Sequence, residues 1–144
     1  MSPPDSLMVT IGSERFRARL RHDLAPRSCG CLLGLLPYAR KIIHARWSGE
    51  ALWSPLGETF PPGLHLPAEN PRDQPAPGEI LLYAGAQSEP ELLVPYGVSR
   101  FACKAGTLQG NPILRIEERL ERLAELGRQV LWSGAQELRI EVSP

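Results

Sequence analysis

The residues with the clearest chemical potential lie in one stretch, 44–53, which reads His-Ala-Arg-Trp-Ser-Gly-Glu-Ala-Leu-Trp. It contains Trp47 and Trp53, two of the three tryptophans in the chain, together with Arg46. The planar guanidinium of arginine matches a pair of oxygen atoms, and tryptophan side chains supply large apolar walls. The stretch therefore predicts a pocket around Arg46 that binds a small carboxylate- or amide-bearing metabolite, with Trp47 and Trp53 as walls.

Polar and aromatic residues in later loops are the further contacts that we expect to this ligand. These loops are rich in glycine, which lets the backbone approach a ligand closely. The candidate ligand-binding residues outside the stretch are Glu69, Asn70, Tyr96, Arg100 and Asn111. For Asn70, which precedes Pro71, the alternative interpretation is an Asx-type turn before the proline.

The same stretch is also compatible with an enzyme. His44 and Glu50 are candidates for proton transfer, with Arg46 as their electrophilic partner and Glu69 as a further candidate. These catalytic groups would suit isomerisation or amide hydrolysis. The chain contains no Gly-x-Ser-x-Gly elbow, phosphate-binding loop or His-Glu-x-x-His motif that would identify a known reaction. The sequence leaves open whether the protein is an enzyme.

A structural interpretation competes with both hypotheses. Ser48-Gly49 lies in the middle of the stretch and predicts a bend or bulge. Arg46 and Glu50 flank this pair, so they can form an ion pair across it, with both tryptophans in the core.

Composition limits the classes of partner. The chain has 144 residues, 16 Lys plus Arg and 16 Asp plus Glu, which gives a formal net charge of +0. We expect one domain, 1–144, and no nucleic-acid or membrane partner, because binding to these polyanions depends on excess cations. No basic start followed by an apolar run marks a signal peptide, so we expect a cytoplasmic protein. The near-zero net charge makes a homodimer plausible.

The three cysteines, Cys29, Cys31 and Cys103, do not form a recognisable metal or redox motif. Buried free thiols are the favoured interpretation. The three histidines add no metal-ligand spacing. We therefore expect no metal site and no cofactor.

The elements that position these residues are short strands. Residues 15–20 alternate apolar and charged side chains, as a half-buried strand does. Further strands are expected at 7–11, 41–47, 50–55, 79–83, 91–95, 100–103 and 137–142, and a proline-rich loop at 56–78. Two helices are predicted. One is capped by Asp23 and carries a stripe from Cys29 to Leu36, and the other spans 115–132, where Gly127 lies on the apolar face.

Many short strands with few free edges favour a closed barrel. We predict a mainly β fold in which two helices cap the barrel and the last strand pairs near the first.

Several stretches together resemble the DUF3830 group, a bacterial family of uncharacterised proteins assigned to the cyclophilin-like fold. The matching stretches are 44–53, 69–71, 77–83, 95–97, 100–106 and 110–111, and the resemblance extends from about Leu7 to Val142. It also includes the Asp-Leu-Ala-Pro-Arg-Ser sequence at 23–28, which is similar to the opening of cyclophilins. The resemblance implies a cyclophilin-like barrel and no established reaction.

Cyclophilins that isomerise proline peptides carry an Arg, a Phe and a Gln at fixed spacing. Arg46 is a plausible counterpart of the Arg, but Ala51 and Ser54 stand where the Phe and the Gln are expected. A vestigial peptidyl-prolyl isomerase is therefore a lesser alternative.

Overall fold

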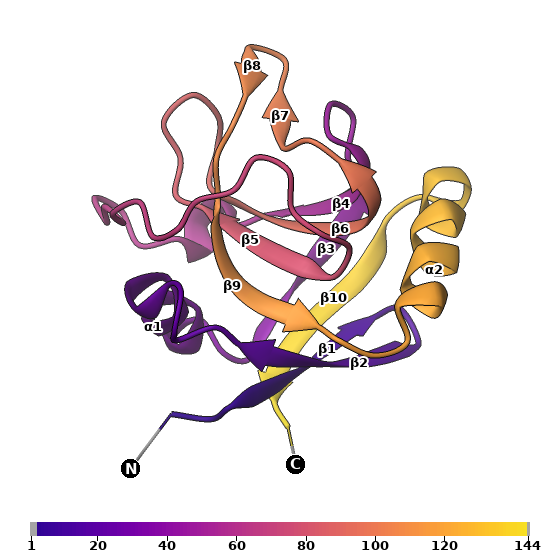
Figure 1. Ribbon diagram of the computed structural model, residues 1–144, viewed down its shortest axis with the longest axis horizontal. Helices are drawn as coiled ribbons and strands as arrows, with labels where there is room; N and C mark the ends of the chain where they lie inside the picture. The colour runs from indigo at the N-terminus through magenta and orange to yellow at the C-terminus, as the bar shows by residue number, and fades with distance from the viewer. Residues whose placement is uncertain (1–2, 144) are drawn as a thin grey trace.

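Short strands joined by turns and loops account for most of the structure (Figure 1). The computed structural model describes residues 3–143. The helices are α1 (Pro26–Gly34) and α2 (Leu120–Ser133), and a short 3-10 helix spans Gly57–Thr59. The strands are β1 (Ser6–Ile11), β2 (Glu14–Leu20), β3 (Tyr38–His44), β4 (Gly49–Pro55), β5 (Glu79–Tyr83), β6 (Glu91–Ser99), β7 (Ala102–Cys103), β8 (Gly106–Thr107), β9 (Asn111–Ile116) and β10 (Gln136–Val142).

Strand β1 closes the barrel, because it pairs with β2 on one side and with β10 on the other. Val9 lies opposite Phe16 of β2 and opposite Ile140 of β10. Around the barrel the order is β1-β10-β3-β4-β6-β5-β9-β2, and β7 and β8 form a separate hairpin. In Figure 1, α1 and α2 lie on opposite sides of this barrel. The predicted mainly β fold, a closed barrel with two helices whose last strand pairs with the first, is confirmed.

The alternation in β2 fills the barrel in the predicted way. Phe16, Ala18 and Leu20 are buried in the main core, whereas the arginines between them face outward. Exposed Arg19 forms an ion pair with Glu117, with Nε and Oε1 3.1 Å apart. The arginine row is thus a solvated outer face of the barrel.

Strands β4, β5 and β6 are buried on both faces. Leu52, Leu82 and Leu92 belong to the main core. Neighbouring residues on the opposite face form a second apolar group, which we call the outer cluster: Ala51, Leu81, Tyr83, Leu93, Phe101 and Leu108. The last two come from segment 100–110, which crosses the outer face of these strands and includes β7 and β8.

The second helix starts later than the sequence indicates. The predicted helix begins at residue 115, but residues 115 and 116 lie in β9, a strand in which Ile113, Leu114 and Ile116 are buried. The prediction is wrong because this strand is apolar on both faces and lacks alternation, and Ile116, Leu120 and Leu123 happen to follow helical spacing. The chain turns into α2 at Arg119, which has a φ of 58°.

The start of α1 also differs from the prediction. The N-cap residue is Ala25, with no side-chain cap of its own. Asp23 instead accepts hydrogen bonds from Arg21, at 3.1 and 3.2 Å. The first amides of α1 are bound by a distant carboxylate, described below.

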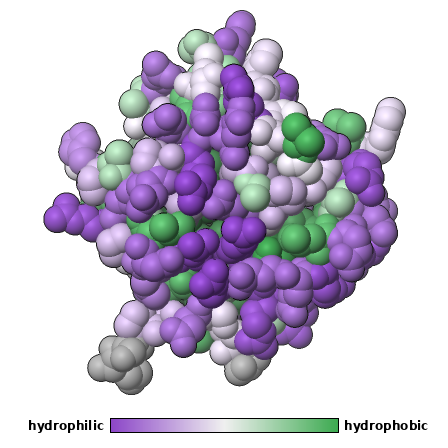
Figure 2. Space-filling model, viewed as in Figure 1, coloured by the Kyte–Doolittle hydropathy of each residue, from purple (hydrophilic) through white to green (hydrophobic). Residues whose placement is uncertain are grey.

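Polar side chains cover most of the face shown in Figure 2, and apolar side chains reach it only in small patches. Within residues 3–143, no helix combines the length and the apolar character that crossing a bilayer requires.

Gly127 brings α2 close to β6. A Cβ atom added at this glycine would lie 2.2 Å from the Tyr96 ring, and Tyr96 is 5% exposed. The close approach of this helix to the sheet therefore requires glycine at this position.

We expect Gly127→Ala to destabilise the protein by about 1–3 kcal/mol, because the new methyl group displaces a packed aromatic ring. Urea unfolding measures the change. Gly30→Ala in α1 is the matched control: a Cβ there meets nothing within 4 Å, so we expect a gain of about 0.5–1 kcal/mol from helix propensity. Equal effects of the two substitutions would contradict the packing argument.

Candidate functional site

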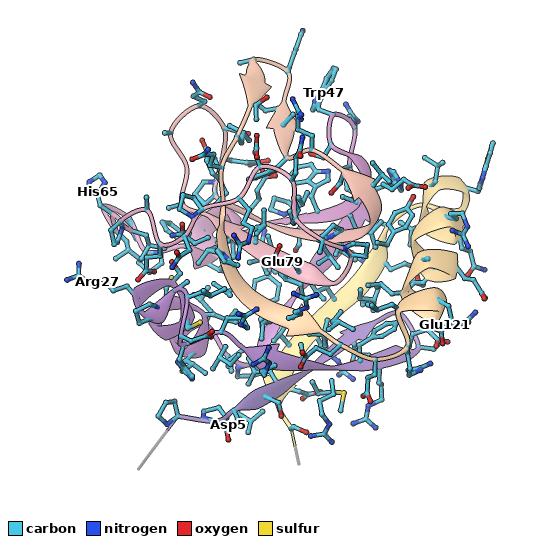
Figure 3. All side chains as sticks on the ribbon, in the orientation of Figure 1. Asp5, Arg27, Trp47, His65, Glu79 and Glu121 are labelled. Carbon is cyan, nitrogen blue, oxygen red and sulfur yellow. The ribbon has the colours of Figure 1, made fainter. Side chains whose placement is uncertain are left out.

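A pocket of about 300 Å³ lies on the outside of the barrel, next to the outer cluster. We call it the outer pocket. The turn between β3 and β4 contributes residues 45–48, the loop before β6 contributes Gln87 and Ser88, and the β7–β8 hairpin contributes 102–105. Trp53 of β4 and Glu91 and Leu93 of β6 complete the lining. Figure 3 labels Trp47 on the β3–β4 turn, beside the β7–β8 hairpin.

Ser48 joins two walls of the outer pocket. Its side chain is buried, and its hydroxyl donates to the carbonyl of Ala102 (3.2 Å) and accepts from the amide of the same residue (3.1 Å). The carbonyl of Ser48 also accepts from the amide of Arg100 at 3.0 Å. The turn that carries Arg46 and Trp47 is therefore fixed to the segment that covers the outer cluster.

The predicted bulge at Ser48-Gly49 is confirmed. The register between β4 and β6 shifts between Gly49 and Ala51. Gly49 has a φ of 85°, and a Cβ there would lie 3.0 Å from the carbonyl oxygen of Val98. This position requires glycine both for its backbone conformation and for its close approach to β6.

Arg46, Trp47 and Trp53 meet at the outer pocket. Trp53 is partly buried against the outer cluster, whereas Trp47 is 55% exposed and forms an outer wall. Arg46 and Lys104 are both exposed at the pocket, and neither forms an ion pair with a residue in the described part of the chain. Lys104 was not predicted as a site residue, since an isolated lysine in a loop has no distinguishing pattern.

Glu91 is the other charged residue that sequence reasoning missed. It lines the outer pocket and is 7% exposed, and within residues 3–143 its carboxyl has no hydrogen-bond or ion-pair partner in the protein. Burial, with a smaller contribution from the charge of Glu89, raises the pKa of Glu91 from 4.5 to about 7. A carboxyl with this pKa can take up or release a proton near neutral pH.

His44 and Tyr96 lie outside the outer pocket lining and contact each other. His44 Nε2 is 2.7 Å from the Tyr96 hydroxyl, and the rings meet edge to face with centroids 5.6 Å apart. The other ring nitrogen of His44 is 2.8 Å from the carbonyl of Ala45. Both ring nitrogens of His44 therefore already have hydrogen-bonding partners. Burial, followed by the charge of Glu50, raises the pKa of Tyr96.

Glu50 faces a different hollow from Arg46. Its Oε1 accepts a hydrogen bond from the amide of Val98 at 2.8 Å, and its side chain packs on Gly97. In the described residues, Arg46 and Glu50 do not form the ion pair considered as the structural alternative. The structure thus does not gather the predicted catalytic residues His44, Arg46 and Glu50 around one cavity.

Glu69 binds the N-terminus of α1. Its carboxylate accepts from the amides of Arg27 (3.0 Å) and Ser28 (2.8 Å) and from the Ser28 hydroxyl (2.7 Å). Burial opposes ionisation, but the Ser28 hydroxyl and then the two amides outweigh it, so the pKa of Glu69 is lowered. Negative charge at this position also complements the helix dipole.

Asn70 and Asn111 belong to the same network. Asn111 accepts from the amide of Glu69 (3.0 Å) and donates to the Ser28 hydroxyl (2.9 Å). Asn70, with a φ of 49°, donates to the carbonyl of Leu24 at 2.8 Å. These contacts tie the proline-rich loop to α1, away from the outer pocket. The side chain of Arg100, which is exposed, does not line the outer pocket either.

The positions that correspond to the isomerase Phe and Gln carry no equivalent surface. Ala51 is fully buried in the outer cluster. Ser54 is also fully buried, with its hydroxyl 2.7 Å from the Tyr38 hydroxyl and donating to the carbonyl of Lys41. Neither side chain is accessible to a peptide.

The cysteines are free thiols, and only Cys29 is fully buried. Burial raises the pKa of Cys29 to about 11, so this thiol is inert at neutral pH. Cys103 is partly exposed at the outer pocket. Among residues 3–143, His, Cys, Asp and Glu side chains do not form a group of three that could hold a metal ion.

Comparisons with known proteins give a family and solved structures with a similar fold. The family model for a protein of unknown function, DUF3830, matches residues 7–142. The solved structure of McbB in complex with tryptophan is similar, with a TM-score of 0.70 and 22% sequence identity, over 95% of this chain and 44% of that chain. The chain therefore spans less than half the length of McbB, and the likeness shows a shared fold. No curated protein gave a match. The barrel is compatible with the cyclophilin-like fold that the family resemblance implies.

The raised pKa of Glu91 predicts a pH-dependent loss of stability. Folding disfavours the ionised form of Glu91. The stabilising contribution of the protonated carboxyl to the free energy of unfolding is therefore fully present below pH 4.5 and is lost as the pH rises through about 7. Between pH 5 and 8 we expect the free energy of unfolding of the wild type to fall by about 2 kcal/mol relative to that of Glu91→Gln. This value is reduced because the carboxyl adjoins the solvent in the pocket. Urea unfolding of both proteins measures this difference. The assignment of this pH dependence to Glu91 would be contradicted if the difference in unfolding free energy between the wild type and Glu91→Gln were constant with pH. It would also be contradicted if the difference between the wild type and Glu89→Gln changed equally with pH.

Removal of the Glu69 charge should weaken α1. We expect Glu69→Gln to cost about 1–2 kcal/mol at pH 7, because the helix amides lose a charged acceptor. Since the pKa of Glu69 is lowered, this stabilisation is present above pH 4.5 and falls as the pH drops through the lower folded value. Chemical unfolding at pH 7 and pH 3 measures both effects. Glu117→Gln, which breaks only the exposed pair with Arg19, should cost less than about 0.5 kcal/mol, and an equal cost would argue against capping.

Proposed function

The chain belongs to the DUF3830 family of proteins of unknown function, and we propose that it binds a small carboxylate- or amide-bearing metabolite in the outer pocket. The observation that carries the proposal is the position of Arg46 and Lys104. Both cations border an apolar pocket, and both lack an acidic partner within residues 3–143. An acid or amide oxygen of a ligand would supply that partner.

The size and the lining of the outer pocket support this class of ligand. A volume of about 300 Å³ is at the lower end of the range for small-molecule sites. Trp53 and Leu93 provide an apolar floor, and exposed Trp47 provides a wall that a bound aromatic or aliphatic group can cover. Burial of such a group contributes about 25 cal/mol per Å² of apolar surface removed from water.

The structural similarity to McbB also supports a small carboxylate-bearing ligand. McbB was solved in complex with tryptophan, which is a small aromatic molecule with a carboxylate. A shared barrel does not transfer the binding residues at 22% identity, so tryptophan is included in the test below as one acid among several.

The enzyme hypothesis has less geometric support. It requires His44 or Glu50 to reach a ligand held by Arg46, and neither residue lines the outer pocket. Binding is therefore the function that the geometry favours.

A thermal-shift screen tests the proposal with small carboxylates, amides, proline peptides and L-tryptophan. We expect at least one acid or amide to stabilise the wild type by about 2.7 kcal/mol at a hundredfold excess over Kd. Arg46→Ala should abolish the shift by removing the oxygen-binding fork. Arg17→Ala, at an exposed site on β2, should keep it. No shift with any compound, or an equal shift in Arg46→Ala, would refute this assignment of the site.

A further inference from the structure

We propose that Glu91 is a second charged contact of the outer pocket, and that the ligand carries a protonated amine as well as an acidic group. This inference rests on the proposed function of the outer pocket and adds a chemical class to it. The ligand would be an amphoteric small molecule whose amine lies at Glu91 and whose acidic group lies at Arg46 and Lys104.

The surroundings of Glu91 provide the first argument. It is the first residue of β6, lies opposite Pro55 of β4 and Tyr83 of β5, and is 7% exposed. A carboxyl buried to this extent is normally paired or hydrogen-bonded, because an isolated buried charge is costly. Within residues 3–143 the protein provides no such partner, while the residue lines a pocket that a ligand can enter. A ligand ammonium would supply both the charge and the hydrogen bonds that are missing.

The charges around Glu91 provide the second argument. Two titratable groups adjoin Glu91: Glu89, whose charge acts on it, and Tyr83, which lies opposite it on β5. Three more line the same pocket, from the β3–β4 turn and the β7–β8 hairpin: Arg46, Cys103 and Lys104. The Tyr83 hydroxyl is already engaged, because it accepts from the amide of Gln87 at 3.0 Å. Burial and the Glu89 charge raise the pKa of Glu91, and within residues 3–143 neither pocket cation forms an ion pair with this carboxyl. The outer pocket thus has an acidic part and a basic part.

The apolar lining indicates what joins the two charged groups of the ligand. Trp53, Leu93 and Ala102 also line the outer pocket. An apolar or aromatic body between the amine and the acid would contact these side chains. A ligand with an acidic group alone would leave the Glu91 carboxyl unpaired and, near neutral pH, partly ionised.

Matched compounds separate the contribution of the amine from that of the acid. Isothermal titration calorimetry would measure Kd for 4-(aminomethyl)benzoate, 4-methylbenzoate and benzylamine at pH 6 and pH 8. A second set, L-tryptophan, indole-3-propionate and tryptamine, provides another spacing of the two groups. The proteins are the wild type, Glu91→Gln, Arg46→Ala and the neighbouring control Glu89→Gln, each checked by circular dichroism for native secondary structure.

We expect the amphoteric member of at least one set to bind the wild type about tenfold more tightly at pH 8 than at pH 6. With a pKa of about 7, the ionised fraction of Glu91 rises from about one tenth to nine tenths over that interval, while the amine remains protonated. Glu91→Gln should weaken this ligand at least tenfold at pH 8 and remove its pH dependence. Glu89→Gln should retain tight binding, and the acid that lacks an amine should not bind more tightly at pH 8 than at pH 6 in either the wild type or Glu91→Gln.

Three outcomes would overturn the inference. If acids bind but their amine-bearing counterparts bind no better, Glu91 does not recognise an amine, and the proposed function stands. If the amphoteric ligand binds more tightly at pH 6 than at pH 8, Glu91 acts as a protonated donor to the acidic group instead. If no member of either set binds, the inference and the proposed function both fail.

Discussion

Strands β4, β5 and β6 carry apolar side chains on both faces, and the need to bury the outer face is the constraint from which the outer pocket follows. Complete burial of a large apolar side chain contributes about 1.5–3 kcal/mol, and Leu81, Leu93 and Phe101 are all almost fully buried on that face. Segment 100–110 must therefore cross the outside of a barrel that is already closed. The outer pocket is the space left where this segment meets the β3–β4 turn and the loop before β6.

Patterns within single elements made most of the fold predictable. Alternation located β2 and β10, and the glycine and proline turns bounded β5 with the same ends that the structure shows. The helical interpretation of residues 115–116 was wrong because a strand buried on both faces has no period of its own. The cap of α1 was also assigned incorrectly. It comes from Glu69, which is far from the helix in sequence, and a local capping rule searches only the adjacent residues.

The residues of the candidate site that could be predicted from the sequence are those of unusual type and spacing. Arg46, Trp47 and Trp53 stood out by type and spacing, and the structure places them around one pocket. Glu91 did not stand out, because a carboxylate at the start of an apolar strand is normally solvated. In the folded barrel it lines a pocket together with residues 45–48 and 102–105, which belong to other elements. Conversely, Glu69, Asn70 and Asn111 were selected as polar residues in a loop, and the structure gives them hydrogen bonds that hold the loop to α1.

The Ser48 hydroxyl donates a hydrogen bond to the carbonyl of Ala102 and accepts one from its amide. The turn with Arg46 and the hairpin with Lys104 are therefore joined directly. The backbone segments that carry the two cations are held to each other by the Ser48 side chain. Width is governed separately, by the loop that carries Gln87 and Ser88 on the other wall. Substitutions in that loop would change the width of the pocket without changing the link between the two cationic segments. The width and the charge of the pocket can therefore vary independently among relatives that keep the serine.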